Sequence, residues 1–332
     1  MADVTIDAVV NANTENRNGI FGPYWTAPAT GYIVYTDFEG ITVQKTTDSG
    51  ATWTEQDPVN NPASANIRSM GAWFDQETKD DSGTIIHIAW VRVTNNDVEY
   101  VQFDTSADTF GTIRTVDALT INNTSASSDV SITKAKSGRV YVAARGDFAA
   151  DTENTYHSMR SSSDGFDANN ESELSPYSAD EEIVVLLAGN AADESDIVAV
   201  VGDGVNQDLE FWKFDASANT WGVTAIDAAL AMVAATMRDI PRFYDATTRH
   251  SDEHILVVYW NDRDITTSDF KSVDITQATP TITGKTNLDT DSDNSYCPSI
   301  LINQQNDDVY AAYVGSDAND ETLFTTVQCY FK

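Results

Sequence analysis

Cysteine, histidine and lysine are scarce in this sequence. Its 332 residues include two cysteines, Cys297 and Cys329, four histidines and eight lysines. Two cysteines are too few for a disulfide framework, and the histidines show no metal-ligand spacing with the cysteines or with one another. We therefore predict no zinc site, no other bound metal and no cofactor.

Long apolar runs are absent as well. No stretch approaches the roughly 18 consecutive apolar residues that a membrane-spanning helix needs, so we predict no membrane insertion. The first ten residues, MADVTIDAVV, lack a basic segment followed by an apolar one. This start is not that of a secretory signal peptide, and we expect no export by the general secretory pathway.

Negative charge dominates the composition. The chain has 52 acidic and 19 basic residues, a formal net charge of −33, and 38 of the acidic residues are aspartate. Because binding to phosphate backbones requires clustered lysine and arginine, this balance argues against a nucleic-acid partner. Concentrated salt screens self-repulsion, so an aspartate-rich, lysine-poor composition indicates a halophilic protein. The alternative is a virion or surface protein that its charge keeps soluble.

Short apolar runs bounded by turn residues recur along the whole chain. Each run has the composition and length of a buried strand. Equivalent positions in successive runs are 53 to 59 residues apart. These positions are Val34, Ala89, Val142, Ala199, Val258 and Ala311. A regular period of this length is the signature of a repeat architecture such as a propeller.

A second series follows the buried runs: an alternating strand that ends in aspartate at a turn, and then an aromatic residue. The pairs are Asp48 with Trp53, Asp104 with Phe110, Asp164 with Phe166, and Asp215 with Trp221. The fifth copy keeps Asp274 without the aromatic, and the sixth has Gln328 in place of aspartate. Each module therefore accounts for about four short strands, which make one propeller blade.

These repeats predict an all-β fold: a six-bladed β-propeller of four-stranded antiparallel blades, in a single domain of residues 1–332. The approximate blades are residues 12–60, 61–120, 121–175, 176–228, 229–286 and 287–332. The last module ends after its third strand, whereas the alternating segment Val4–Val10 precedes the first module. We predict that residues 4–10 supply the missing outer strand and close the ring, which removes an exposed sheet edge.

One of the aspartate turns carries a complete motif. Residues 46–53 match Ser/Thr-x-Asp-x-Gly-x-Thr-Trp, with Thr46, Asp48, Gly50, Thr52 and Trp53 at the defined positions. Aspartate can accept hydrogen bonds from backbone amides in a tight turn, glycine permits positive φ, and the aromatic ring can pack between sheets. These roles are architectural, so the motif is specific for a hairpin and a fold and says little about catalysis.

On these residues the chain resembles the sialidase-like, Asp-box (BNR-repeat) propellers, and the repeats extend the resemblance along nearly its whole length. The resemblance implies a six-bladed propeller. In the family's enzymes it also implies an arginine triad that binds the sugar carboxylate, a Tyr-Glu nucleophile pair and an aspartate acid/base around a central funnel. The family's Phe/Tyr-Arg-Ile-Pro motif is missing, since GIFGPYW at Gly19 has no arginine in that place. We therefore assign no catalytic residue and expect a non-catalytic member.

Five residues are candidates for a ligand site in the funnel, because they lie in or near strands that open blades. They are Arg68, Arg238, Arg242, Tyr244 and Tyr296. Arginine binds carboxylates through two hydrogen bonds, and a tyrosine near a carboxylate can act as a nucleophile. The alternative for the arginines is ion pairing with nearby aspartates. The alternative for the tyrosines is a structural role.

The preferred interpretation is a non-enzymatic structural or recognition propeller. Asp-box propellers without a leader resemble components of tailed-virus particles, which implies a capsid- or tail-associated protein that decorates the particle or contacts a host surface glycan. The expected partners are other virion proteins or copies of this chain, and the expected location is a virion assembled in the host cytoplasm and exposed to a high-salt exterior. The alternatives are a sialidase-type glycoside hydrolase, an exo-glycosidase acting on acidic sugars, and an extracellular or cell-surface protein.

Overall fold

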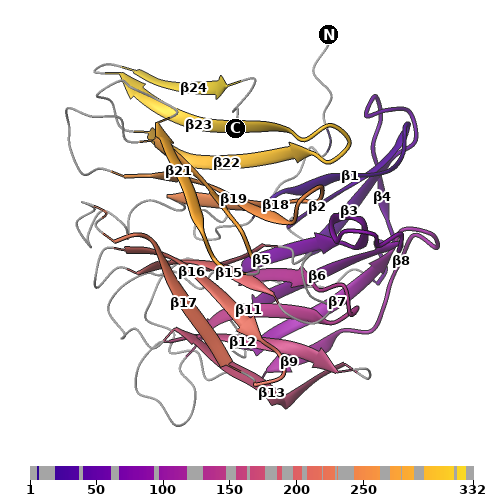
Figure 1. Cartoon of the computed structure of the whole chain (residues 1–332). Coiled ribbons are helices and arrows are strands. Elements are labelled where there is room, and N and C mark those ends of the chain that lie inside the picture. The colour runs from indigo at the N-terminus through magenta and orange to yellow at the C-terminus, as the bar shows by residue number, and fades with distance from the viewer. Residues whose placement is uncertain are drawn as a thin grey trace. The chain divides into compact units, whose positions relative to one another are not determined.

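The structure is a computed structural model that describes most of the chain. The described residues are 6, 19–36, 40–60, 67–92, 97–117, 130–146, 155–162, 165–175, 185–188, 197–203, 208–218, 220–228, 230, 243–261, 270–277, 279–287, 295–317 and 320–326. The chain divides into two compact units. Unit 1 comprises Met1–Lys134 and Arg139–Pro176, and unit 2 comprises Ala135–Gly138 and Tyr177–Lys332. Antiparallel sheets make up each unit (Figure 1).

Unit 1 contains three sheets. The first comprises β1 (Phe21–Ala27), β2 (Thr30–Thr36), β3 (Ile41–Thr46) and β4 (Thr54–Gln56). The second comprises β5 (Ile67–Phe74), β6 (Ile85–Arg92), β7 (Asp97–Asp104), β8 (Thr109–Phe110) and β9 (Arg114–Asp117), with β8 and β9 both paired to β7. The third comprises β10 (Val130–Lys134), β11 (Val140–Gly146), β12 (Thr155–Ser162) and β13 (Gly165–Ser175). A short 3-10 helix, η1 (Asp75–Glu77), follows β5.

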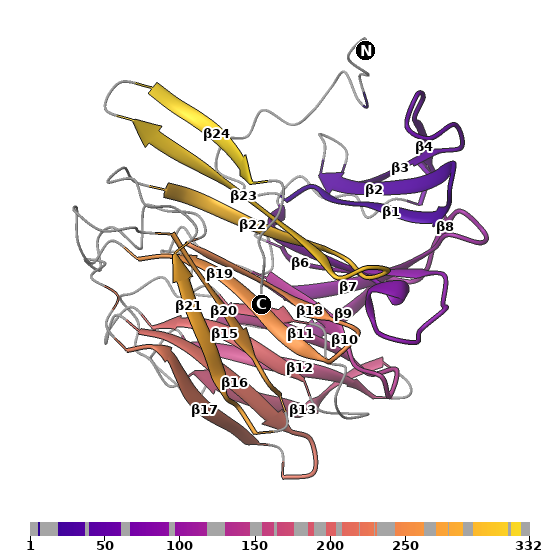
Figure 2. The same ribbon diagram turned by 45° about the horizontal axis from the view of Figure 1, so that its top comes forward.

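Unit 2 also contains three sheets, whose strands lie side by side in chain order (Figures 1 and 2). The first comprises β14 (Val185–Ala188), β15 (Val198–Asp203), β16 (Asp208–Asp215) and β17 (Thr220–Asp227). The second comprises β18 (Tyr244–Arg249), β19 (His254–Trp260), β20 (Phe270–Ile275) and β21 (Ile282–Asn287). The third comprises β22 (Ser295–Asn303), β23 (Asp308–Asp317) and β24 (Asp320–Thr326).

The recurrent apolar runs of the sequence form the second strand of each sheet. β6 and β19 are buried along almost their whole length. Each contributes side chains to one apolar cluster on one face and to a different cluster on the other face. Both faces must therefore be apolar, which explains why these runs lack the alternation of a half-exposed strand.

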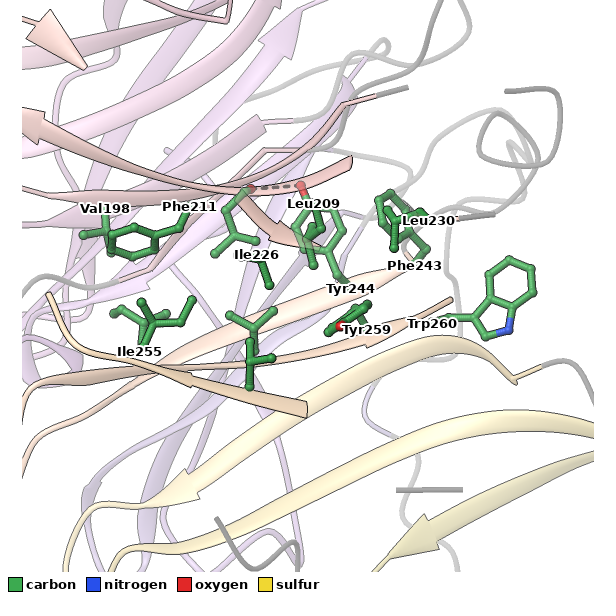
Figure 3. Packing of buried hydrophobic residues seen from close by; sticks show 14 residues of the cluster. Val198, Leu209, Phe211, Ile226, Leu230, Phe243, Tyr244, Ile255, Tyr259 and Trp260 are labelled. Carbon is green, nitrogen blue, oxygen red and sulfur yellow. Dashed lines mark hydrogen bonds between the residues drawn. The ribbon is translucent and has the colours of Figure 1, made fainter. Parts of the chain in front are cut away.

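Apolar clusters fill the space between neighbouring sheets within each unit. In unit 1 one cluster joins the first two sheets through Val34 and Ile88, and another joins the second and third sheets through Ala89 and Val142. In unit 2 the corresponding cluster lies between the sheets β14–β17 and β18–β21 (Figure 3). The first strands of neighbouring sheets are in contact, β5 with β1 and β10, and β18 with β14 and β22. This face-to-face packing of antiparallel sheets is a β-propeller arrangement.

The prediction of six four-stranded blades is wrong in that form, because four sheets are four-stranded blades and two are not. The second sheet has five strands, since its outer position is split into β8 and β9, which both pair with β7. The last sheet has three strands, and residues 327–332 lie outside the described residues. Ring closure by residues 4–10 also falls outside them, apart from Ile6, and stays a prediction.

Candidate functional site

The Asp-box turn joins β3 to β4 and is closed by side-chain hydrogen bonds. Asp48 Oδ1 accepts from the Thr52 amide (2.8 Å) and from Thr46 Oγ1 (2.8 Å), and Thr52 Oγ1 donates to Asp48 Oδ2 (2.7 Å). The Gly50 amide donates to Thr46 Oγ1 (2.9 Å), and its φ of 88° is one that glycine adopts without strain. Trp53 Nε1 donates to the Gly50 carbonyl (3.2 Å), so the indole closes the turn.

Two further aspartate turns have the same chemistry. Asp104 Oδ1 accepts from the amide (2.8 Å) and hydroxyl (2.7 Å) of Ser106, and Asp215 Oδ1 accepts from the amide (2.9 Å) and hydroxyl (2.6 Å) of Ser217. In each of the three turns, hydrogen bonds to the aspartate lower its pKa. The main donors are Thr52 to Asp48, Ser106 to Asp104 and Ser217 to Asp215. The copy at Asp164 lies outside the described residues. The described turn carboxylates therefore stabilise hairpins.

The fifth aspartate, Asp274 in β20, takes part in an ion-pair cluster. Its Oδ2 accepts from Arg249 Nη2 (2.9 Å), and its Oδ1 lies 2.5 Å from His254 Nδ1. Arg249 also donates to Asp252 through Nε (2.8 Å), and hydrogen bonding to Asp252 raises the pKa of the guanidinium. The Arg249 side chain is only 11% exposed. This cluster holds the β18–β19 hairpin against β20.

The three arginines and Tyr296 of the predicted ligand site lie wholly or in their side chains outside the described part of the structure. Arg238 and Arg242 lie outside the described residues. Arg68 is in β5 and Tyr296 is in β22, but their side chains lie outside the described part of the structure. Their convergence on a ligand stays a prediction.

Tyr244, the remaining candidate, is a core residue of unit 2. Its side chain is fully buried, and its hydroxyl donates to the Val200 carbonyl (2.9 Å) and accepts from the Gly202 amide (3.3 Å). The ring packs edge-on against Phe243 at 4.7 Å within the cluster shown in Figure 3. The hydroxyl therefore links β18 to β15, which is the structural alternative stated for this tyrosine.

A buried polar cluster in unit 1 brings together four side chains that the sequence analysis did not single out. Asp75 Oδ1 lies 2.8 Å from His87 Nε2, and Asp75 Oδ2 accepts from the Ile85 amide (2.9 Å). His87 Nδ1 lies 2.5 Å from the Tyr100 hydroxyl. Lys134 Nζ donates to Asp75 Oδ1. The cluster thus joins η1, strands β6 and β7, and the last residue of β10.

One feature of the sequence could have indicated this cluster. After Thr84 at its start, the apolar run TIIHIAW contains one polar residue, His87, at a position that the strand must bury. A buried polar side chain needs a hydrogen-bonding partner. The run therefore indicates that partners exist, although it does not identify Asp75 and Tyr100.

Burial and hydrogen bonding set the protonation states of the cluster. Burial raises the pKa of Asp75, but hydrogen bonds from His87 and Lys134 outweigh it and lower that pKa to about 2. Burial lowers the pKa of His87 despite its contact with Asp75. Burial also raises the pKa of the Tyr100 hydroxyl. A neutral imidazole then donates a hydrogen bond from Nε2 to the carboxylate and accepts one from the Tyr100 hydroxyl at Nδ1.

The cluster has the composition of a catalytic acid–base relay, but its side chains are not accessible to a substrate. A general base must come within hydrogen-bond reach of a substrate proton. Residues Asp75, His87 and Tyr100 are each no more than 5% exposed, and both ring nitrogens of His87 are already engaged. The chemistry that this arrangement supports is the compensation of a buried charge between three strands.

A second buried polar cluster lies in unit 2. Asp227, at the end of β17, accepts from the Tyr259 hydroxyl (2.9 Å) and from Asn261 Nδ2 (3.3 Å), and Lys271 Nζ lies 3.7 Å away. Asp227 is 5% exposed and Tyr259 is fully buried. Burial raises the pKa of the Tyr259 hydroxyl, and Asp227 raises it further. This carboxylate therefore connects the sheets β14–β17 and β18–β21.

The described residues form neither a metal site nor a membrane-spanning helix. In that part of the chain, no group of three or more histidine, cysteine or acidic side chains could hold a metal ion. Over the same residues, no helix has the length and apolar character to cross a membrane.

Comparison with known proteins shows likeness in structure only. No protein-family model matches the sequence, and no curated protein matches it. Among solved structures, the Hadza microbial sialidase Hz136 is 10% identical with a TM-score of 0.52, over 91% of this chain and 63% of that one. The polysaccharide lyase Uly1 is 10% identical with a TM-score of 0.51, over 94% and 76%. The hydrazine synthase of Kuenenia stuttgartiensis is 11% identical with a TM-score of 0.52, over 92% and 80%.

These likenesses show the fold and no more. The chain spans less than two thirds of the sialidase it resembles. A sialidase, a lyase and a hydrazine synthase perform unrelated reactions, so their shared fold does not select one of them for this chain. The protein is thus an all-β chain with a β-propeller arrangement.

Proposed function

We propose that this chain is a non-enzymatic structural or recognition propeller. The observation that carries the proposal is the burial of its assembled acid–base side chains. In the described part of the chain, Asp75, His87 and Tyr100 are bonded to one another out of solvent, as are Asp227 and Tyr259. Groups placed in this way stabilise the sheets that they join and do not reach a substrate.

The acidic composition supports a setting rich in salt. A net charge of −33 destabilises a compact chain by self-repulsion unless ions screen it. We propose a halophilic virion component, capsid- or tail-associated, that is assembled in the host cytoplasm and exposed to a high-salt exterior. Its proposed partners are other virion proteins, copies of this chain and a host surface glycan. An extracellular or cell-surface protein is the alternative location.

The second candidate is a sialidase-type glycoside hydrolase acting on acidic sugars. The structural likeness to a microbial sialidase supports it at the level of fold. Arg68, Arg238 and Arg242 also supply the residue type that binds a sugar carboxylate through two hydrogen bonds. This candidate requires that those arginines converge and that a tyrosine and a carboxylate lie beside them.

Binding and hydrolysis measured together on the full chain distinguish the two candidates. The chain is applied at high salt to an array of neutral and acidic glycans, and in parallel to a fluorogenic sialoside. We expect no turnover. Turnover that is lost in Arg68→Ala or Arg242→Ala, but kept in Arg114→Ala at an exposed position outside the candidate set, would establish the hydrolase and remove the non-enzymatic proposal.

We further propose that residues 4–10 complete the sheet β22–β24. That sheet has three strands where four others have four, and the segment Val4–Val10 has the alternation of a strand. Pairing along β24 would remove an open edge. Truncating the chain before residue 12 and measuring its thermal stability tests this pairing.

A further inference from the structure

Trp25 in β1 is the one exposed tryptophan of the chain. All seven tryptophans lie among the described residues, and Trp25 is 43% exposed whereas the other six are buried or half-buried. Each of those six has a structural role: the indoles of Trp53, Trp73 and Trp212 donate hydrogen bonds, Trp221 packs on Phe214, and Trp90 and Trp260 are core residues. Within the described part of the chain, the Trp25 indole makes no hydrogen bond.

The ring of Trp25 lies against the backbone of Gly31, its partner residue in the neighbouring strand β2. A Cβ added at Gly31 would lie 2.8 Å from Cε3, 3.0 Å from Cζ3 and 3.1 Å from Cδ2 of the indole. Three consecutive ring atoms at nearly equal distances mean that the ring meets the glycine with its face. Gly31 does not have positive φ, so the close approach of the ring explains a glycine within this strand.

The complete Asp-box holds the hairpin that carries Trp25. Ser49, within the motif, donates from its amide to the Ala29 carbonyl (3.0 Å) and from its hydroxyl to the Pro28 carbonyl (3.4 Å). Pro28 and Ala29 form the turn between β1 and β2. The motif therefore fixes the two strands between which the ring lies, and a binding side chain on a rigid element keeps its geometry.

The surface around Trp25 is uncharged. No charged residue occurs from Gly19 to Thr36, although 21% of the residues in the chain are charged. The exposed residues of β1, and the 75% exposed isoleucine before it, are all uncharged: Ile20, Gly22, Pro23, Trp25 and Ala27. Exposed apolar side chains grouped in this way mark an interaction surface.

We infer that Trp25 is a stacking platform for a neutral pyranose ring of a glycan. A pyranose with equatorial substituents presents axial C–H bonds on its faces, and these pack on an exposed aromatic face, which carries negative partial charge. The indole N–H is a hydrogen-bond donor for a sugar hydroxyl. This inference rests on the glycan recognition proposed above and names its site and its ligand class.

Charge and area select this ligand. The net charge of −33 repels acidic sugars and anionic lipids, and an uncharged hairpin forms no ion pair with a basic protein. The exposed part of the indole amounts to about 100 Å², taking 43% of roughly 250 Å². A stable protein partner needs about 800 Å² on each side. A single sugar ring suits the smaller area.

Titration calorimetry on the full chain at molar salt compares two neutral probes, cellohexaose and chitohexaose, with an acidic one, hyaluronan hexasaccharide. We expect a neutral probe to bind and the acidic probe not to bind. Trp25→Ala should weaken binding about tenfold or more, and Trp25→Phe should weaken it less, because phenylalanine keeps a smaller ring face. Tyr310→Ala is the matched control: it removes a 38% exposed aromatic side chain from β23 and should leave the affinity unchanged.

Three results would overturn the inference. Binding of a neutral probe that Trp25→Ala leaves unchanged removes the platform and keeps the glycan recognition. Binding confined to the acidic probe removes the neutral ligand class. Binding to none of the probes removes the platform together with the glycan partner. Turnover of the sialoside in the assay described above removes the non-enzymatic proposal whatever the Trp25 variants show, so the two failures are distinguishable.

Discussion

Asp75 carries a negative charge in a site where its side chain is only 3% exposed. Taking a carboxylate out of water costs several kcal/mol unless charge and hydrogen bonds compensate it. Here Lys134 supplies the opposite charge, while His87 and the Ile85 amide satisfy the carboxylate oxygens. Lys134 also binds the partly exposed Asp81 at 2.8 Å, so one ammonium serves two carboxylates.

Removing the Lys134 ammonium should therefore destabilise the folded chain strongly. Lys134→Met leaves Asp75 charged and buried, and we expect the free energy of unfolding to fall by about 3 kcal/mol. In the double variant Lys134→Met/Asp75→Asn the uncompensated charge is gone, so about 1 kcal/mol or more should be recovered. Urea unfolding of the single and double variants measures both quantities.

The control for this prediction is the neighbouring lysine, Lys136. Its ion pair with Glu253 spans 3.3 Å, and both side chains are at least one quarter exposed. Because solvent screens such pairs, Lys136→Met should cost less than about 1 kcal/mol. Equal losses in the two lysine variants would contradict the proposed role of Lys134.

The same cluster predicts loss of stability in acid. The folded-state pKa of Asp75 is about 2 against an ordinary value of 3.8, so its contribution is complete above about pH 4 and is lost as the pH falls toward 2. That difference in pKa corresponds to about 2 kcal/mol in the free energy of unfolding. Burial lowers the pKa of His87, so protonation of this residue in the unfolded chain also reduces stability as the pH falls below its ordinary value of 6.5.

Denaturant unfolding between about pH 7 and pH 2 would measure this dependence. We expect the loss between pH 4 and pH 2 to be about 2 kcal/mol smaller in Asp75→Asn than in the wild-type chain. Parallel curves for the two proteins in this range would mean that Asp75 is not the group responsible.

At the scale of elements, close contact between neighbouring sheets depends on glycine at particular strand positions. Gly202 in β15 faces the ring of Phe243, which directly precedes β18. A Cβ added at Gly202 would lie 2.5 Å from Phe243 Cζ and 3.3 Å from Tyr244 Cε1. Both rings are at most 1% exposed and lie in the cluster of Figure 3, where little space exists for them to move.

Gly202→Ala should consequently destabilise unit 2 through overpacking, by about 2 kcal/mol. Gly222 in β17 is the matched control, because a Cβ there meets no atom closer than 3.9 Å. Gly222→Ala should be nearly neutral or slightly stabilising, since alanine restricts the unfolded chain more than glycine does. Thermal unfolding of both variants decides the matter, and a neutral Gly202→Ala would show that the rings can shift.

At the scale of the whole molecule, the last sheet has only three described strands, one fewer than a complete blade. β24 pairs only with β23 in the described structure, so its other side is an open edge there. If residues 4–10 pair with it, the first and last parts of the chain stabilise one another. A segment that pairs in this way contributes far more than an unattached terminus.

Deletion of residues 1–11 tests that pairing. We expect the midpoint of thermal unfolding to fall by several degrees, which corresponds to about 1 to 2 kcal/mol for a chain of this size. A control that replaces residues 12–16 with a glycine–serine linker of equal length should have little effect. An unchanged midpoint after the deletion would show that the segment adds no strand.

Much of the fold could be predicted from local pattern. The period of the apolar runs indicated the second strands correctly, because a strand covered on both faces must be apolar throughout. The turn at Asp48 could be predicted because its hydrogen bonds join residues at most four positions apart. The split between β8 and β9 could not be predicted, because the aspartate-turn pattern around Asp104 does not show how far the following outer strand continues.

By itself the sequence determined the all-β class, the spacing of the sheets, the aspartate turns and the acidic surface, since each depends on composition or on neighbours along the chain. Only the tertiary structure decided that Lys134 meets Asp75, 59 positions away, that the Tyr244 hydroxyl binds β15, and that Asp227 is buried at the end of β17. The physical reason is that convergence of distant side chains depends on how sheets pack, and residue type and spacing do not specify that geometry.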